Sequence, residues 1–134
     1  MAKEHLNPAS LFPSLPLGFS QIVTARGGMT LYISGQTAWD AEKRIVGGND
    51  LGEQTRQALR NIQTAVETAG GTMSDVVSLR IYVVNYKRAD AGTIGKATSE
   101  FFSADNPPAS TLIGVSSLAV EDFLIEIEAI AVID

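Results

Sequence analysis

The sequence predicts an α+β fold in which a single mixed sheet carries two helices on one face. Segments rich in β-branched residues alternate with two helical patterns along the chain. Each passage from strand through helix to strand favours a crossover that leaves the two strands parallel. With 134 residues the chain is long enough for one core of its own, so residues 1–134 are expected to form one domain.

An extended arm is expected over residues 1–17. It contains three of the five prolines, namely Pro8, Pro13 and Pro16. Proline fixes φ and removes a backbone donor, so the arm is not expected to be helical.

Strands are expected to follow the arm. Residues 21–25 and 29–35 have the β-branched and aromatic composition typical of strands. Gly27 and Gly28 lie between them and suit a tight hairpin turn. Residues 39–46 are expected to continue as a third strand or as an ordered loop.

Two helices are predicted. Asp50 can cap the first, and Glu53 three residues later completes a capping box. Apolar residues then recur at helical spacing, at Leu51, Ala58, Leu59, Ile62, Ala65, Val66 and Ala69. Gly70 ends this helix. The second helix is expected over residues 90–102, although two glycines within it weaken the prediction.

Three further segments complete the sheet. Residues 76–84 are apolar on one face and substantially apolar on the other, so this strand is expected to be covered on both sides. Residues 110–115 and 123–133 are the last two strands. Because both helices lie on one face, the other face needs a cover, and another subunit is the natural one. The hydrophobic content of 45% also favours apolar surface buried between subunits.

Composition excludes several classes of function. The chain has no cysteine, which excludes disulfides, thiol catalysis and thiolate-bound metals. Its one histidine, His5, lies in the polar N-terminal tail, which argues against histidine triads and multi-histidine zinc sites. A net charge of -5 with scattered basic residues argues against nucleic-acid binding. No apolar stretch reaches the ~18 residues of a membrane span, and residues 1–5 lack the apolar region of a signal peptide. We therefore expect a cytoplasmic protein that does not bind membranes.

Short motifs recur in a fixed order along the chain. They are Gly18-Phe19-Ser20-Gln21, Ser34-Gly35-Gln36, and Pro108-Ala109-Ser110 followed by Glu126-Ile127-Glu128-Ala129-Ile130-Ala131. Each motif is weak alone. The ordered set covers nearly the whole chain from Gly18 on, and it resembles the Rid family, also called the YjgF/RidA or reactive-intermediate deaminase family.

The resemblance implies a chorismate-mutase-like fold assembled as a homotrimer, with clefts between neighbouring subunits. In the best-known members the cleft hydrolyses enamines and imines derived from amino acids, without metal or cofactor, and releases ammonia and a 2-keto acid. An arginine in a Pro-Ala-Arg-Ser setting holds the substrate carboxylate. A backbone stretch matching Ser34-Gly35 and a glutamate matching Glu126 help to place substrate and water. We therefore expect a small-molecule ligand, no metal and no cofactor.

The sequence departs from this pattern at three positions. Ser110 stands in place of the arginine, Phe19 in place of the usual tyrosine, and Gly95 in place of an asparagine often found in the second helix. A bidentate arginine–carboxylate contact is among the stronger polar pairings. At ~1.5–3 kcal/mol for each charge-assisted bond, its loss weakens binding of an amino-acid-derived anion by roughly two to four orders of magnitude. Ser110 and Thr111 are candidate neutral donors to a ligand, or ordinary strand hydroxyls.

Three charged residues on the predicted strands are open to two interpretations. Glu126 and Glu128 share one face of a strand. In one interpretation both carboxylates are simply the solvent-facing residues of the strand. The resemblance instead implies that Glu126 lines the cleft, where it would transfer protons. Glu128 is expected to have a structural role. Arg80 lies mid-strand among apolar residues, so it is expected to pair with one of these carboxylates or to contact substrate.

The favoured function is a RidA-like small-molecule hydrolase with enamine/imine deaminase-type chemistry in an intersubunit cleft. Deamination of 2-iminobutyrate is predicted to be weak or absent because of Ser110. The alternative is a non-catalytic trimer that binds a metabolite and regulates a partner, which the joint loss of three polar contacts favours. Endoribonuclease activity, a label sometimes attached to this family, is disfavoured by the acidic charge and the lack of a histidine base.

Overall fold

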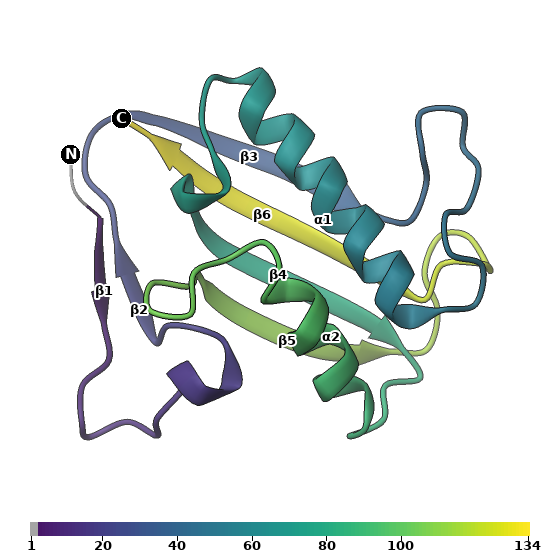
Figure 1. Cartoon of the computed structure of the whole chain (residues 1–134), viewed down its shortest axis with the longest axis horizontal. Coiled ribbons are helices and arrows are strands. Elements are labelled where there is room, and N and C mark those ends of the chain that lie inside the picture. The colour runs from purple at the N-terminus through teal and green to yellow at the C-terminus, as the bar shows by residue number, and fades with distance from the viewer. Residues whose placement is uncertain (1–2) are drawn as a thin grey trace.

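A computed structural model, which describes residues 3–134, shows a sheet layer and a helix layer (Figure 1). The main sheet has four strands in the order β3 (Met29–Gln36), β6 (Ile125–Ile133), β4 (Val76–Val84) and β5 (Ala109–Val115). Strand β6 is antiparallel to both of its neighbours, whereas β4 and β5 are parallel. The predicted α+β fold with a mixed sheet is therefore confirmed.

Helix α1 (Leu51–Thr68) begins and ends close to the predicted residues. The Asp50 carboxylate accepts a hydrogen bond from the backbone N–H of Glu53 at 2.9 Å, which caps the first turn. At the other end Gly70 has a φ of 93°, a conformation that favours glycine and stops the helix.

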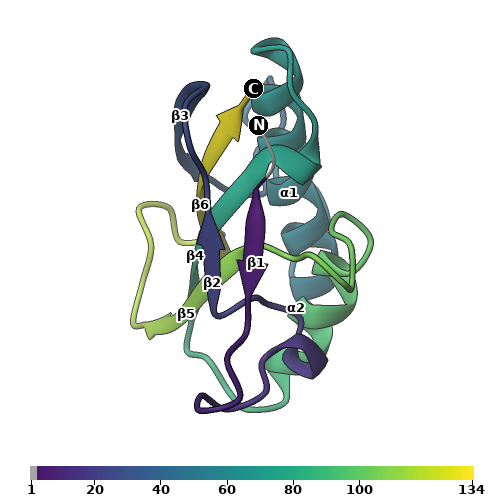
Figure 2. The ribbon, with the colours of Figure 1, turned by 90° about the vertical axis from the view of Figure 1, so that its left-hand side faces the viewer.

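Helix α2 (Asp90–Thr98) is shorter than predicted, and residues 99–102 form turns. The predicted extension to residue 102 was wrong. The hydroxyls of Thr98 and Ser99 donate to the carbonyl oxygens of Gly95 and Lys96, three residues earlier, and such side-chain bonds compete with the helix. Within the turn, Glu100 accepts a hydrogen bond from Arg56 of α1 at 2.7 Å, which holds the two helices together. Both helices cover the same face of the sheet, as predicted (Figure 2).

The hydrophobic core lies between the helices and this face. Its buried members on the central strands and on α1 are Leu79, Ile81, Val83, Ile125, Ile127, Ala129, Ala131, Ala58, Leu59, Ile62 and Val66. Because side chains alternate along a strand, burial of Ile125 and Ile127 places Glu126 and Glu128 on the opposite face.

We call that opposite face the open face. Tyr32 of β3 is 80% exposed there, and Ile113 of β5 is 43% exposed. Within the described part of the chain, no second layer covers these strands (Figure 2). The predicted cover by another subunit is consistent with this exposure.

The N-terminal region differs from the prediction. Strand β1 (Glu4–Leu6), in the predicted arm, pairs antiparallel with β2 (Ile22–Thr24) in a separate two-stranded sheet. The expectations of a single sheet and of a hairpin at Gly27 and Gly28 were therefore wrong. Both glycines have positive φ, and a Cβ at Gly28 would overlap the backbone of Ile133. The pair lets the chain pass close to the end of β6 instead of closing a hairpin.

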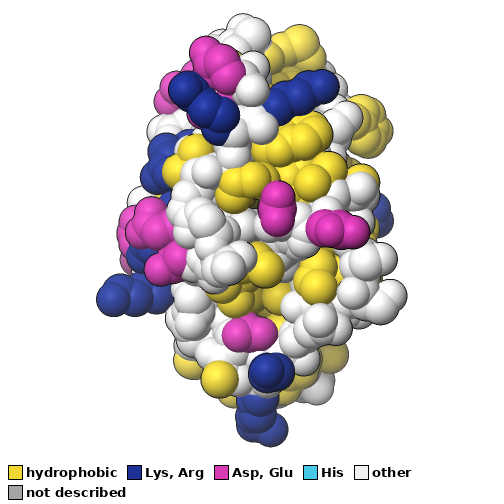
Figure 3. Space-filling model, turned by 90° about the vertical axis from the view of Figure 1, so that its right-hand side faces the viewer, with side chains coloured by type: hydrophobic (Ala, Val, Ile, Leu, Met, Phe, Trp, Pro, Cys, Tyr) yellow, Lys and Arg dark blue, Asp and Glu magenta, His cyan; other side chains and the backbone are white. Residues whose placement is uncertain are grey.

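Residues 39–46 form an ordered loop with a bridge between Trp39 and Ile45, one of the two predicted forms. The Trp39 ring packs edge-on against Phe123, with centroids 4.9 Å apart. At the end of the molecule that carries this loop, hydrophobic and acidic side chains share the middle of the surface, and most Lys and Arg lie towards its margin (Figure 3). Within residues 3–134 no helix is long and apolar enough to cross a membrane.

Candidate functional site

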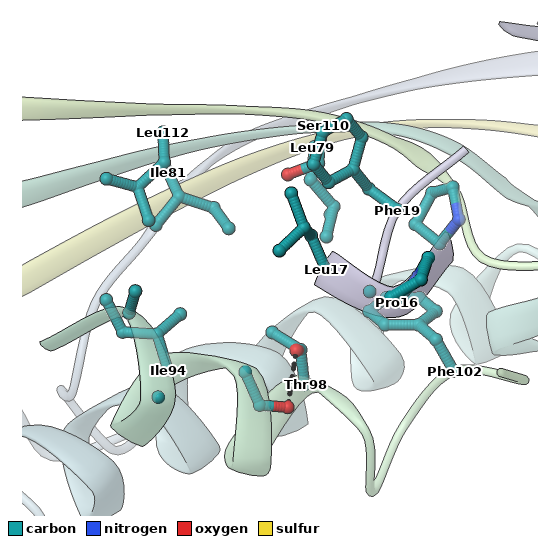
Figure 4. A pocket seen from close by; sticks show the side chains of 15 residues that line it. Pro16, Leu17, Phe19, Leu79, Ile81, Ile94, Thr98, Phe102, Ser110 and Leu112 are labelled. Carbon is teal, nitrogen blue, oxygen red and sulfur yellow. Dashed lines mark hydrogen bonds between the residues drawn. The ribbon is translucent and has the colours of Figure 1, made fainter. Parts of the chain in front are cut away.

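A cavity of about 490 Å³ lies between helix α2 and the edge strand β5 (Figure 4). Strands β4 and β5 form one wall, α2 forms the second, and the short 3-10 turn Leu15–Leu17 with the residues after it forms the third. The larger apolar side chains that line it are Pro16, Leu17, Phe19, Leu79, Ile81, Ile94, Phe102, Pro108 and Leu112. No charged side chain of the described residues lines this cavity. Its volume is within the range of small-molecule sites.

The polar side chains in the cavity are two hydroxyls, those of Thr98 and Ser110 (Figure 4). Thr98 Oγ1 donates to the carbonyl oxygen of Gly95 at 3.0 Å, within its own helix. Ser110 pairs with Leu79 in the sheet and so points to the helix side. Its hydroxyl has no hydrogen-bond partner among residues 3–134, which leaves it available to a ligand.

Small residues on α2 give the cavity its width. Ala91, Gly92 and Gly95 line it, and a Cβ at either glycine would meet no heavy atom within 4 Å. The sequence singled out both glycines as residues that weaken a helix and Gly95 also as the replacement of an asparagine, but the apolar lining from β4 and α2 was missed. The glycines themselves were the available signal for the cavity, because a helix face without side chains leaves empty volume between the helix and the sheet.

The arm positions the third wall of the cavity. Ser20 is buried, and its hydroxyl donates to the Pro107 carbonyl oxygen at 2.5 Å, while Nδ1 of His5 lies 3.1 Å from the same oxygen. Lys3 Nζ pairs with Asp75 at 3.0 Å. His5 is thus a structural contact of strand β1 and not a solvated tail residue. These contacts fix the chain that leads into Phe19.

A second group of expected site residues gathers on the open face. The pairing of β3 with β6 slips between Ile33 and Gln36, and Ser34 and Gly35 occupy this irregularity. A Cβ at Gly35 would overlap the Glu126 carboxylate, so only glycine permits this approach without displacement. Among the described residues, the Glu126 carboxylate has no hydrogen-bond or ion-pair partner.

Beside this group, three side chains form a connected cluster. The Tyr82 hydroxyl donates to Glu128 Oε1 at 2.5 Å, and Arg80 Nη1 lies 3.7 Å from the same oxygen. The hydrogen bond to Glu128, with burial as a smaller cause, raises the pKa of Tyr82 above its ordinary value. The prediction that Arg80 pairs with one of the two carboxylates is confirmed, with Glu128 as the partner.

The expected site residues therefore fall into two groups within one chain. Phe19 and Ser110 line the cavity, whereas Ser34, Gly35 and Glu126 lie on the open face. Thr111 pairs with Arg80, so it also points to the open face, away from its neighbour Ser110. Strands β3 and β5 are opposite edges of the sheet, three strand spacings or about 14 Å apart. Within residues 3–134 there is also no group of three or more His, Asp or Glu side chains that could hold a metal ion.

Similarity to known proteins extends over almost the whole chain. Residues 13–133 match the family model described as Endoribonuclease L-PSP. The structure resembles that of YyfB from Yersinia pestis, a protein of unknown function in the conserved Rid family, with a TM-score of 0.93 and 43% sequence identity, over 99% of this chain and 100% of that one.

Two further protein sequences are also similar. The chain is 34% identical over 120 residues to a 2-iminobutanoate/2-iminopropanoate deaminase of Dermatophagoides farinae, which covers 89% of each chain. It is 36% identical over 117 residues to a RutC family protein of Pyrococcus horikoshii, which covers 87% of this chain and 88% of the other.

Proposed function

Because this chain belongs to the Rid (YjgF/RidA) family, we propose that it is a hydrolase that deaminates a small imine or enamine, with Glu126 as its catalytic group. The observation that carries the proposal is the unpartnered Glu126 carboxylate, which lies against Gly35 on a rigid sheet. The deaminase name of the Dermatophagoides farinae relative supports the same reaction class.

The proposed reaction is addition of water to a C=N bond. Glu126 accepts a proton from water as the water oxygen bonds to the imine carbon, and it passes this proton to the nitrogen, which gives an aminoalcohol. The hydroxyl proton of the aminoalcohol then moves to the nitrogen as the C–N bond breaks, which forms the carbonyl group and releases ammonia. The balance is one imine and one water giving one carbonyl compound and one ammonia. The imine carbon is already electrophilic, so the site mainly has to position the reactants and exclude bulk solvent.

The complete site is proposed to form between copies of the chain. Glu126 and Ser110 lie on opposite sides of the sheet, with β3 and β5 at its two edges, so a single chain does not bring them together. In a closed ring of copies, the cavity of one chain can lie against the open face of the next, which joins the two groups in one cleft. We propose a homotrimer with such clefts, and the exposed Tyr32 and Ile113 supply apolar surface for its contacts.

The proposed substrate is not the anion 2-iminobutyrate. Ser110 stands where the family pattern has its carboxylate-binding arginine, and the cavity around it has no charged lining residue in the described chain. Weak or absent activity on this anion is therefore expected. Ammonia release from freshly generated 2-iminobutyrate and from a panel of uncharged imines tests this, with wild type, Glu126→Gln and Ser110→Arg compared.

We expect Glu126→Gln to lower turnover of the uncharged imines by about 10²–10⁴-fold, because it removes the base and keeps the shape. Ser110→Arg is expected to gain activity on 2-iminobutyrate. Full activity of Glu126→Gln contradicts the assigned role. Strong wild-type activity on 2-iminobutyrate contradicts the reading of Ser110, and Arg80→Ala then tests whether Arg80 holds the carboxylate.

The alternative function, a non-catalytic metabolite-binding trimer, is favoured by the apolar character of the cavity where the family pattern is polar. It predicts saturable binding of a neutral ligand with no ammonia release from any imine of the panel. That result would contradict the proposed hydrolase and support the binding function.

A further inference from the structure

We infer that the cavity beneath α2 binds an uncharged, largely apolar group of about the size of an aromatic ring, and that Gly92 and Gly95 set the size it accepts. The inference rests on the proposed function in taking this group to be part of the substrate. It assigns a ligand class and two specificity-determining positions to one half of the proposed site.

The charge of the ligand follows from the lining. An anion that enters the cavity loses water and finds no cation among the described lining residues. The floor is almost closed to bulk solvent, since Leu79, Ile81 and Ile94 are 3%, 4% and 2% exposed. Desolvation of a carboxylate there is therefore not offset. The free Ser110 hydroxyl suits one neutral polar atom, such as an amide oxygen or an imine nitrogen.

The size of the ligand follows from the volume. An apolar cavity of about 490 Å³ is much larger than the four-carbon skeleton of 2-iminobutyrate requires. A ligand that leaves most of the volume empty forfeits dispersion contacts with the walls. An aromatic ring is small enough for this volume, and Phe19 and Phe102 of the lining offer it aromatic surface.

The glycines determine how much of that volume exists. A side chain at Gly92 or Gly95 meets open space, so it projects into the cavity without overlapping the protein. Neither glycine has a positive φ, so the helix does not need glycine for its backbone conformation. Any other residue is a better helix former than glycine, proline excepted. The glycines are thus explained by the space they leave.

Apolar residues continue to the rim. Leu17 is 66% exposed and Leu112 36% exposed, and both line the cavity. Exposed apolar side chains beside a pocket are typical of a binding surface. The same rim can contact a neighbouring copy, so the experiment has to separate a ligand from a subunit contact.

Benzamide and benzoate are suitable probes, because they share one ring and differ in charge. Calorimetric titration into the wild-type protein at neutral pH is expected to show benzamide binding at least tenfold more tightly than benzoate. Gly95→Leu is expected to weaken benzamide binding at least tenfold by filling the cavity. Lys96→Leu is the matched control, because Lys96 is exposed on the same helix outside the cavity, and its affinity is expected to stay unchanged.

Further measurements keep the result interpretable. Gly92→Leu repeats the filling at a second position should Gly95→Leu fail to fold, as judged by circular dichroism. Ser110→Arg is expected to reverse the preference towards benzoate. Light scattering reports the mass of each assembly, which filling the cavity is expected to leave unchanged.

Three outcomes overturn the inference. They are equal or tighter binding of benzoate by the wild type, unchanged benzamide affinity in both leucine variants, and loss of the assembly in those variants, which identifies the cavity as a subunit contact. Binding of benzamide without ammonia release from any imine supports the inference and contradicts the proposed enzyme. Turnover of imines without any binding of benzamide supports the proposed enzyme and contradicts the inference.

Discussion

The cavity beneath α2 and the open face lie on opposite sides of the same strands, and their chemistry differs sharply. The cavity has apolar walls and one free hydroxyl, that of Ser110. The open face carries Arg80, Tyr82, Glu126 and Glu128 on two adjacent strands. Alternation along β4 and β5 is sufficient to produce this contrast, because successive residues point to opposite faces.

The contrast assigns two requirements of an enzyme, substrate binding and proton transfer, to different faces of the sheet. Affinity for an apolar group needs desolvated surface, which the helix layer supplies on one side. Proton transfer needs a carboxylate that is not neutralised by a partner, which Glu126 supplies on the other. Under the proposed function each chain supplies its cavity to the cleft with one neighbour and its Glu126 to the cleft with the other. Substrate preference and proton transfer therefore depend on different residues and can change independently.

The largest expected effect contrasts burial on the two faces. Ile81→Ala removes a side chain that is 4% exposed, and we expect it to destabilise the protein by about 2–5 kcal/mol. Ile113→Ala, on the open face, is expected to cost about 1 kcal/mol or less, because the side chain is 43% exposed. Urea unfolding at low protein concentration measures both. Equal losses at the two positions would show that the open face is buried as tightly as the core.

A smaller effect is expected where the two faces carry glycine for different reasons. Gly35→Ala places a Cβ on the Glu126 carboxylate and displaces it, so we expect about a tenfold loss of ammonia release with little change in stability. Gly92→Ala is the counterpart on the cavity side. Its Cβ meets open space, so we expect Glu126 to stay in place and activity to fall only for imines with a large apolar group. The measurement is turnover of an uncharged imine together with thermal unfolding. An active Gly35→Ala protein would mean that the position of Glu126 is not critical.

The smallest effect concerns the pH dependence of the open face. Because the neutral Tyr82 phenol donates to Glu128, its pKa is raised above 10.0. Its stabilising contribution is therefore present below the ordinary tyrosine pKa and is lost as pH rises through the raised value. In an absorbance titration of tyrosinate, Tyr82→Phe is expected to remove the phase that appears at the highest pH. Tyr32→Phe, also on the open face, is expected to keep that phase.

Local patterns predicted the elements whose causes are local. Helix α1 could be placed because its cap at Asp50 and its stop at Gly70 are single-residue signals. The alternation of Ile125, Glu126 and Ile127 predicted which face each side chain takes. Strand β1 was missed because three residues carry little signal and their partner, β2, lies far along the chain.

The sequence also could not predict that the candidate site residues are divided between the cavity and the open face. Ser110 and Thr111 are adjacent, and only the register of β5 on β4 decides which points to the cavity. Similarly, the closeness of Gly35 and Glu126 depends on the slip in pairing between β3 and β6. Residue types suggested the participants, whereas register decided which of them meet.

The side chain of Gln54 has a consequence for the loop before β6. Fully buried in α1, it donates to the carbonyl oxygens of Gly48 and Asp122 and accepts from the N–H of Leu124. All three partners are backbone groups. The path of the chain into Ile125 and Glu126 is thus encoded in the helix. Exposed side chains of the loop, such as those of Ser117 and Glu121 but not the buried Phe123, can therefore be exchanged for other polar residues without moving the carboxylate.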